Sequence, residues 1–361
     1  MRSLRIAFTG NVFPFGKGHA YGGERELEYL SEGLTKLGHK VYLFAREGTN
    51  VKLVEDYVPV PPLTNERDVH FEAAKAYSEK HGIEFDIYQC NYFGEGWSRE
   101  SQERWPYVEL VWNRWCHSFF QLKETPFNVV SYSKRLQGAL DATGIKTTMI
   151  HYGLPRDLYR CELEKDDYAV WIGKIEAGKA PQLAIQLAKA AGLKIVLMGP
   201  PYNSSHFWQL VAPYINNQDV FWVRGVDDEM KFKIMSKAKV FISSNDNSWC
   251  EDMGIVNLES LAMGTPIIAF NRINQNCAIV TDKIIEDGKH GFILNYKDSN
   301  DLQEILDTGV PLINRIGEIN PLDCREQFEA RFTADLMARR YEWLFEQVVA
   351  GARFGEAEVP F

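Results

Sequence analysis

Residues 239–270 read KVFISSNDNSWCEDMGIVNLESLAMGTPIIAF, and this stretch has the pattern of one strand, one helix and a second strand. The runs 239–243 and 266–270 are apolar and rich in β-branched residues, which favours strands. The apolar residues between them indicate a buried helix that begins near Gly254. Strands that alternate with helices form parallel sheets covered by helices. The stretch therefore predicts a parallel α/β sheet.

The same alternation runs through the whole chain. Further strands are expected at 4–8, 40–44, 86–90, 108–112, 128–132, 168–172, 194–198 and 219–223, with helices such as 23–37, 181–191 and 227–237 between them. The pattern starts twice, near Leu4 and again near Tyr168. We therefore expect an α/β protein of two doubly wound, Rossmann-like domains.

The domain boundary is expected in HYGLPRDLYRCELEKDD (151–167), where Gly, Pro and a charge cluster suit a linker. The predicted domains are residues 1–155 and 156–330, followed by a terminal helix and tail at 331–361. Residues 326–348 form an amphipathic pattern, which predicts the terminal helix. Its apolar side chains available for packing are Phe328, Phe332, Met337, Tyr341 and Leu344.

Composition limits the classes of function. The 361 residues carry a net charge of −9, which argues against a broad nucleic-acid-binding surface. The six cysteines include no CxxC pair, so we expect neither a disulfide framework nor a zinc site, and a reducing cytoplasm as the compartment. No stretch approaches the roughly 20 apolar residues of a membrane-spanning helix. Membrane association is expected to be peripheral at most.

Two glutamates in the opening stretch are candidates for ligand binding. The backbone amides of Gly254, Ile255 and Val256 would begin the helix unpaired and could bind a phosphate. Glu251, just before the helix, could accept hydrogen bonds from hydroxyls beside that phosphate. Glu259, about two turns deeper, could accept the two hydroxyls of a ribose. A loop charge and a solvated helix residue would show the same sequence pattern.

Three further groups lie near predicted strand ends or helix starts. Lys174 and Lys179 follow the strand at 168–172 and suit a diphosphate, although surface lysines are common. Gly22 and Gly23 open the first helix and would let a ligand approach the backbone, or would serve the turn alone. Tyr21 occupies the place of the third glycine of a dinucleotide fingerprint, which disfavours a dehydrogenase.

One histidine follows the strand at 108–112. His117 could donate a hydrogen bond or act in acid–base chemistry, but a lone histidine also fits a structural role. Asn113 and Arg114 share its neighbourhood. Asp227 and Asp228 have the pattern of a helix cap, so we expect no metal site there.

An ordered set of motifs carries a family resemblance over nearly the whole chain. The motifs are GGERELEYLSEGLTKLGHKV (22–41), SYSKRL (131–136), IHYGLPRDLY (150–159), GKIEAGK (173–179), VRGVDDEM (223–230) and CEDMGIVNLESLAMGTP (250–266). In this order they resemble glycosyltransferase family 4, the retaining nucleotide-sugar transferases with the GT-B fold. The resemblance implies two Rossmann-like domains that face each other across a cleft, with the terminal helix crossing back to the N-terminal domain.

The resemblance also implies a donor site. Glu259 would hold the donor's ribose, Glu251 its sugar, and the amides of Gly254, Ile255 and Val256 its diphosphate. The other residues implied at the donor are Lys174 and Lys179 at the diphosphate, Arg224, Gly225 and Val226 at the base, Asp252 and Met253 within the central motif, and Gly22 and Gly23 from the N-terminal domain. His117 would be the active-site histidine. The expected catalytic residues are therefore His117, Glu251, Lys174 and Lys179.

The implied reaction moves a sugar from a nucleoside diphosphate sugar to an acceptor hydroxyl with retention of anomeric configuration. The donor would be linked to UDP, GDP or ADP, and the acceptor would be a sugar or glycoconjugate. Neither a cofactor nor a metal ion is expected. Two alternatives share the same binding residues: a sugar-nucleotide epimerase, which needs no acceptor, and a catalytically silent sugar-nucleotide-binding protein.

Overall fold

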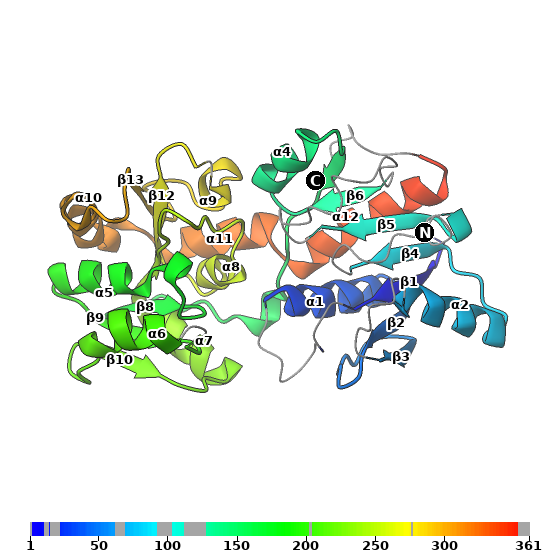
Figure 1. Ribbon diagram of the computed structural model, residues 1–361, viewed down its shortest axis with the longest axis horizontal. Coiled ribbons are helices and arrows are strands. Elements are labelled where there is room, and N and C mark those ends of the chain that lie inside the picture. Colours follow the sequence, from blue (N-terminus) through cyan, green and yellow to red (C-terminus); the bar gives the residue numbers. More distant parts are fainter. Residues whose placement is uncertain are drawn as a thin grey trace. The chain divides into compact units, whose positions relative to one another are not determined.

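The structure is a computed structural model that describes residues 2–10, 14, 22–61, 69–91, 103–111, 128–201, 204–275 and 277–352. The chain divides into two compact units. Unit 1 comprises Met1–Pro155 and Phe332–Phe361, and unit 2 comprises Arg156–Arg331. Each unit is built around its own parallel sheet (Figure 1).

The described residues of unit 1 form a seven-stranded sheet in the order β3-β2-β1-β4-β5-β6-β7. Its strands are β1 (Arg5–Thr9), β2 (Lys40–Arg46), β3 (Asp56–Val60), β4 (Ile87–Cys90), β5 (Tyr107–Leu110), β6 (Val129–Ser131) and β7 (Thr147–Met149). Neighbouring strands run parallel, with Ile6 of β1 in register with Val41 on one side and Ile87 on the other. All three side chains are fully buried, as a parallel sheet covered on both faces requires.

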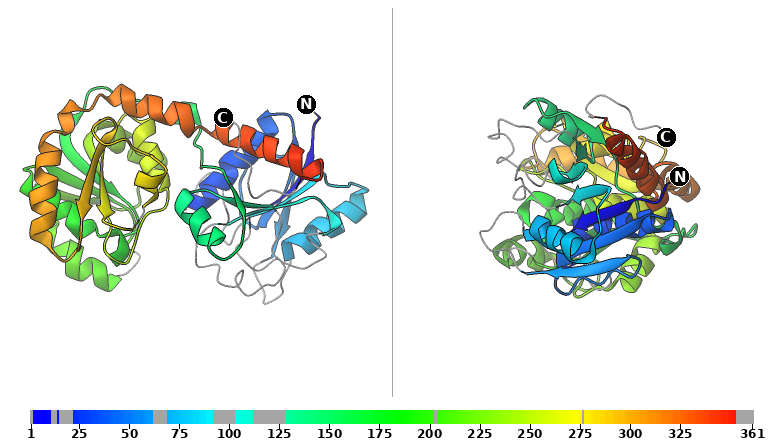
Figure 2. Two further views of the ribbon diagram at one scale, coloured as in Figure 1. Left: turned by 90° about the horizontal axis from the view of Figure 1, so that it is seen from above. Right: turned by 90° about the vertical axis from the view of Figure 1, so that its right-hand side faces the viewer.

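Two helices from opposite ends of the chain pack together in unit 1. The described helices of this unit are α1 (Gly22–Lys36), α2 (Val69–His81), α4 (Lys134–Asp141) and α12 (Ala334–Val349). The C-terminal helix α12 packs against α1 (Figure 2). Gly33 makes this approach possible, because a Cβ atom there would lie only 2.8 Å from the Cβ of Ala338. The expected return of the terminal helix to the N-terminal domain is therefore seen in unit 1.

The described residues of unit 2 form a six-stranded sheet in the order β10-β9-β8-β11-β12-β13, again with parallel neighbours. The strands are β8 (Asp166–Ile172), β9 (Lys194–Met198), β10 (Val220–Val223), β11 (Ala238–Ser243), β12 (Ile267–Arg272) and β13 (Gly291–Tyr296). Its helices include α5 (Pro181–Ala190), α6 (Ser204–His206), α7 (Asp228–Lys237), α8 (Ile255–Ala262), α9 (Ala278–Thr281), α10 (Leu302–Asn314) and α11 (Pro321–Arg331).

The crossovers of unit 2 run in two directions from the centre of its sheet. The chain passes from β8 through α5 to β9 toward one edge, and from β11 through α8 to β12 toward the other edge. Because such crossovers are right-handed, α5 and α8 lie on opposite faces of the sheet. This arrangement is the doubly wound fold that the sequence predicts.

The structure corrects the prediction of one terminal helix at 326–348. The helix is broken between α11 and α12, where Thr333 caps α12 by accepting a hydrogen bond from the amide of Leu336 (3.3 Å). The residues at the break also pair with Leu154 of the linker segment, because the amide of Leu154 donates to the carbonyl of Phe332 (2.9 Å) and its carbonyl accepts from the amide of Ala334 (2.8 Å). The five apolar side chains named for this region are all buried, as predicted.

A buried histidine in α2 should make unit 1 sensitive to acid. Burial, followed by the positive charge of Arg46, lowers the pKa of His70 to about 4 from 6.5. The folded protein therefore keeps His70 neutral while the unfolded chain binds a proton, and stability is lost as the pH falls from 6.5 toward 4. Between pH 7 and pH 5 this one group should lower the free energy of unfolding by about 2 kcal/mol.

Urea unfolding at the two pH values tests this prediction. The wild-type protein should lose about 2 kcal/mol more than His70→Gln, which cannot titrate in this range. Equal losses for both proteins would contradict the role of His70.

Within the described part of the chain, no helix combines the length and the apolar character that a membrane crossing requires.

Candidate active site

The strand order of unit 2 changes direction between β8 and β11, at the centre of its sheet. In open α/β sheets ligands bind outside the carboxyl ends of the strands at such a switch point. The loop after β8 contains Lys174 and the short 3₁₀ helix η3 (Ala177–Lys179), and the loop after β11 contains Glu251. The fold therefore places the strongest candidate binding residues at the sheet edge where ligands bind in folds of this kind.

Ser244 ties the two loops together. Its hydroxyl accepts a hydrogen bond from the indole of Trp171 on β8 (3.0 Å) and donates to the carbonyl of Lys179 (2.9 Å). The amide of Asp246 also donates to the carbonyl of Gly178 (3.0 Å). The backbone positions of Lys179 and of the loop after β11 are thus fixed relative to each other.

Hydrogen bonds within the unit also hold the loop after β11. The carboxylate of Asp246 accepts from the amides of Ser248 (2.7 Å) and Trp249 (3.2 Å). The hydroxyl of Tyr296 donates to the carbonyl of Asn245 (3.0 Å) and accepts from that residue's side-chain amide (2.9 Å). Because burial raises the pKa of Tyr296, this hydroxyl stays neutral and keeps its donor proton.

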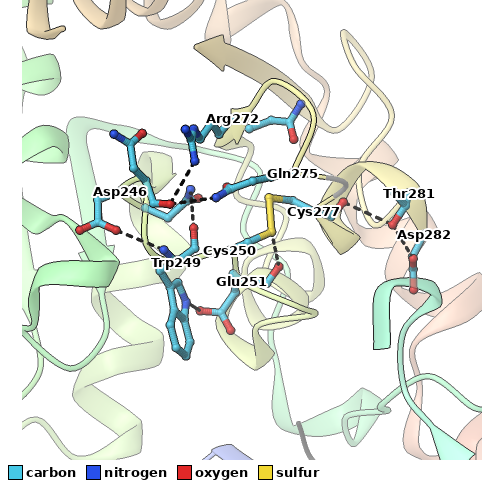
Figure 3. Close-up of a disulfide and its surroundings, with 12 residues drawn as sticks. Asp246, Trp249, Cys250, Glu251, Arg272, Gln275, Cys277, Thr281 and Asp282 are labelled. Carbon is cyan, nitrogen blue, oxygen red and sulfur yellow. Dashed lines mark hydrogen bonds between the residues drawn. A yellow bond between two sulfur atoms is a disulfide. The ribbon is translucent and has the colours of Figure 1, made fainter. Parts of the chain in front are cut away.

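A disulfide adds a covalent link to the same loop. Cys250 is bonded to Cys277, which precedes α9, and their Cα atoms are 5.7 Å apart (Figure 3). The sequence analysis expected no disulfide framework and did not predict this single bond, because only the fold brings together two cysteines that are 27 residues apart in the sequence. The cysteine pattern consequently no longer supports a reducing compartment.

Glu251 and Lys179 form an ion pair beside an exposed tryptophan. The ammonium of Lys179 lies 2.6 Å from Oε2 of Glu251, and both side chains are about one quarter exposed (24% and 28%). The indole nitrogen of Trp249 lies 3.5 Å from the same oxygen (Figure 3), and the Lys179 ammonium is 5.8 Å from the centre of the Trp249 ring. Lys174 lies half-buried on the same loop as Lys179.

The start of α8 requires a glycine. Gly254, at the N-cap, has φ +63°, and a Cβ atom there would lie 2.7 Å from both Cγ of Glu251 and the side-chain nitrogen Nδ2 of Asn257. Gly254 has no side chain that could cap the helix. The first amides of α8, those of Ile255 and Val256, therefore lie at a helix N-terminus, which attracts anions. Asp252 and the buried Met253 connect Glu251 to this start.

Glu259 is fully buried in α8, so the alternative of a solvated helix residue is wrong. Its Oε1 atom lies 2.6 Å from the ammonium of Lys231 on α7 and accepts a 3.3 Å hydrogen bond from the hydroxyl of Tyr159. Its Oε2 atom has no hydrogen-bond partner among the described residues. A buried oxygen without a partner is costly, and a ligand hydroxyl could satisfy it.

The segment predicted to lie against the base follows β10. Arg224 is exposed, and its guanidinium lies 4.7 Å from the centre of the Trp222 ring. Gly225 has φ +61° and Val226 is partly buried. The carboxylate of Asp227 accepts a 2.8 Å hydrogen bond from the amide of Met230, which confirms the predicted helix cap.

The candidates in unit 1 are only partly described. Gly22 and Gly23 form the first residues of α1, which confirms that they open the first helix. His117, Asn113 and Arg114 lie outside the described residues. Lys231 and Tyr159 are the site residues that the sequence analysis missed. Tyr159 ends the motif IHYGLPRDLY, and Lys231 directly follows VRGVDDEM, so each was within reach of a quoted motif.

Part of unit 2 matches a known protein family. Residues 161–308 match the family model described as "Glycosyl transferases group 1". This match covers less than half of the chain, but it includes Lys174, Lys179, Glu251 and Glu259. No curated protein sequence matches this chain.

The chain is similar in fold to several solved structures of glycosyltransferases. A glycosyltransferase involved in avilamycin A biosynthesis has a TM-score of 0.68 at 17% identity, over 97% of this chain and 99% of that chain. A glycosyltransferase from Rickettsia africae has a TM-score of 0.71 at 14% identity, over 98% and 100%. A pneumococcal O-GlcNAc transferase, solved with UDP and GlcNAc, has a TM-score of 0.57 at 14% identity, over 77% and 60%.

These similarities confirm the predicted fold class, two Rossmann-like domains with parallel sheets as in GT-B glycosyltransferases. Together with the family match they support a GT-B glycosyltransferase.

Proposed function

We propose that this protein is a retaining glycosyltransferase of family 4 that transfers a sugar from a nucleoside diphosphate sugar to an acceptor hydroxyl in glycan or glycoconjugate biosynthesis. The observation that supports this proposal most strongly is the group of residues at the edge of the unit 2 sheet where β8 and β11 end. There the Lys179–Glu251 pair lies beside the uncapped start of α8, and Glu259 lies within that helix with one buried oxygen unpartnered.

The donor's diphosphate would bind the amides of Ile255 and Val256 together with Lys174 and Lys179. A diphosphate carries more negative charge than a carboxylate, so it would compete with Glu251 for the Lys179 ammonium. Glu251 would then be able to accept hydrogen bonds from the donor sugar. Asp252 and Met253 would lie within this donor segment between Glu251 and Gly254. Glu259 would bind the ribose.

The base would lie against Arg224, Gly225 and Val226. The exposed guanidinium of Arg224, stacked on Trp222, gives this loop a flat polar surface suited to a ring. The pneumococcal neighbour with bound UDP supports a uridine donor among the three candidates, UDP, GDP and ADP.

Charge stabilisation would be the main contribution to catalysis. As the bond to the sugar breaks, negative charge develops on the leaving diphosphate, and two lysines and helix amides placed there stabilise it without a metal ion. A phosphate oxygen of the leaving group can take the proton of the acceptor hydroxyl. We assign acceptor binding to unit 1. Gly22 and Gly23, which open α1 in that unit, would approach the phosphates and sugar of the donor, and His117 would be the active-site histidine.

A nucleotide panel followed by product analysis tests the function. Thermal shift with UDP, GDP and ADP should identify one preferred base, and the corresponding sugar nucleotides with simple sugar acceptors should then release that diphosphate. NMR of the product should show the anomeric configuration of the donor. A new sugar nucleotide formed from donor alone would indicate the epimerase instead. Binding without release of diphosphate in any acceptor extract would indicate a silent binding protein.

A further inference from the structure

The environment of Glu259 is unusual for a carboxylate. The side chain is fully buried, and burial of a charge is expensive unless the charge is paired and hydrogen-bonded. Among the described residues, the cation paired with Glu259 is Lys231, whose side chain is itself only 15% exposed. The pairing is therefore shielded from solvent, and its geometry should be well defined.

The position of the Lys231 ammonium is set by its own helix. Asp228, one turn earlier on α7, lies 3.7 Å from the ammonium, and the ring of Phe232 lies 4.9 Å from it. Asp227 caps the same helix end. The first turns of α7 therefore hold Lys231, and α7 begins immediately after the loop Arg224–Val226.

The two oxygens of Glu259 have different surroundings. Oε1 is contacted by both Lys231 and the hydroxyl of Tyr159, whereas Oε2 has no hydrogen-bond partner among the residues that the structure describes. Two donors on one oxygen fix the rotation of a carboxylate about its terminal bond. Among the described residues, Oε1 is thus paired twice, whereas Oε2 is a buried acceptor that still lacks a donor.

We propose that Lys231 is a positioning residue that orients Glu259 so that Oε2 accepts one ribose hydroxyl of the nucleotide. This inference rests on the proposed function and deepens it, because it names the group that makes Glu259 selective. It also revises the expectation that both oxygens of Glu259 receive hydroxyls. Lys231 acts through Glu259 and needs no contact with the nucleotide.

The orientation has a measurable consequence. A nucleotide that lacks the bound hydroxyl leaves Oε2 buried and unsatisfied, and sites built to hydrogen-bond a hydroxyl reject analogues that lack it. The analogue that lacks the bound hydroxyl is either the 2′-deoxy or the 3′-deoxy nucleoside diphosphate. We expect the wild-type protein to bind that analogue on the order of 30-fold more weakly than the parent compound. Without Lys231 the carboxylate can rotate or take up a proton, and this discrimination should fall.

Isothermal titration calorimetry with the preferred nucleoside diphosphate and its 2′-deoxy and 3′-deoxy counterparts tests the proposal. Lys231→Met keeps the length of the side chain without its charge and should discriminate less than about 3-fold. Lys231→Arg, which restores the charge, should recover most of the discrimination. Lys233→Met, on an exposed position of the same helix, should behave as wild type.

The outcomes separate the two proposals. A structural role alone would lower the melting temperature of Lys231→Met and leave its discrimination at the wild-type level, which would overturn the positioning role. If Lys231→Met does not fold, Tyr159→Phe removes the other donor to Oε1 and should lower the discrimination several-fold, and an unchanged value would overturn the proposal.

Wild-type protein that binds the nucleotide without deoxy discrimination would refute this inference alone. Wild-type protein that binds no nucleoside diphosphate would refute the proposed function as well.

Discussion

Replacing Lys174 and Lys179 together by methionine is expected to lower kcat/KM for sugar transfer by about 10³-fold. Both residues lie on the loop after β8, and Lys179 is held there by the hydrogen bond of its carbonyl to Ser244. Each charge-assisted contact to the diphosphate contributes roughly 1.5–3 kcal/mol, and these contacts strengthen as the leaving group gains charge. Methionine retains the length and the apolar part of each side chain, so packing should change little.

Initial rates over a range of donor concentrations give kcat and KM separately. The loss should appear mainly in kcat, because the cations act most strongly on the transition state. Lys189→Met is the matched control, since Lys189 is exposed near the other end of α5, and it should retain the wild-type rate. A double variant within about threefold of wild type would remove the diphosphate role from this pair.

Replacing Glu259 by alanine should weaken binding of the free nucleoside diphosphate by about 100-fold. The change removes the proposed ribose contact and leaves the ammonium of Lys231 without its carboxylate, which lies 2.6 Å away in the intact protein. Breaking a buried ion pair by removing one partner lowers the free energy of unfolding by about 3 kcal/mol or more. Calorimetry and urea unfolding of the same variant measure the two effects.

Two further variants make this prediction specific. Glu259→Gln keeps the shape of the side chain but not its charge, and it should fold better than the alanine variant while still binding the nucleotide weakly. Glu229→Ala, at an exposed position of α7, should match the wild type in both measurements. An unchanged nucleotide affinity in Glu259→Ala would show that the ribose assignment is wrong, whatever its effect on stability.

The central strands of both sheets could be predicted from the sequence, and the edge strands largely could not. The three strands that the analysis missed, β3, β7 and β13, all lie at the edge of a sheet. An edge strand has a neighbour on one side only, so it tolerates polar residues and proline. Asp56 and Pro59 in β3 and the two threonines of β7 accordingly interrupt the apolar runs that mark buried strands.

The candidate site shows the same division between local and distant information. The stretch around Glu251 and Glu259 carries a local signal, because a loop, a glycine and an apolar helix follow one another in the sequence. No local sequence signal links Glu259 to its partners, since Lys231 and Tyr159 lie 28 and 100 residues away along the chain. The Cys250–Cys277 disulfide escaped prediction for the same reason: only the fold brings its two halves together.

The most direct test of the account is a crystal structure of the protein with its preferred nucleoside diphosphate bound. We predict phosphate oxygens within hydrogen-bond distance of the amides of Ile255 and Val256 and of the Lys179 ammonium, with a ribose hydroxyl on Oε2 of Glu259. A nucleotide bound elsewhere, with Glu251 and Glu259 still contacting only Lys179, Lys231 and other side chains of the protein, would contradict it.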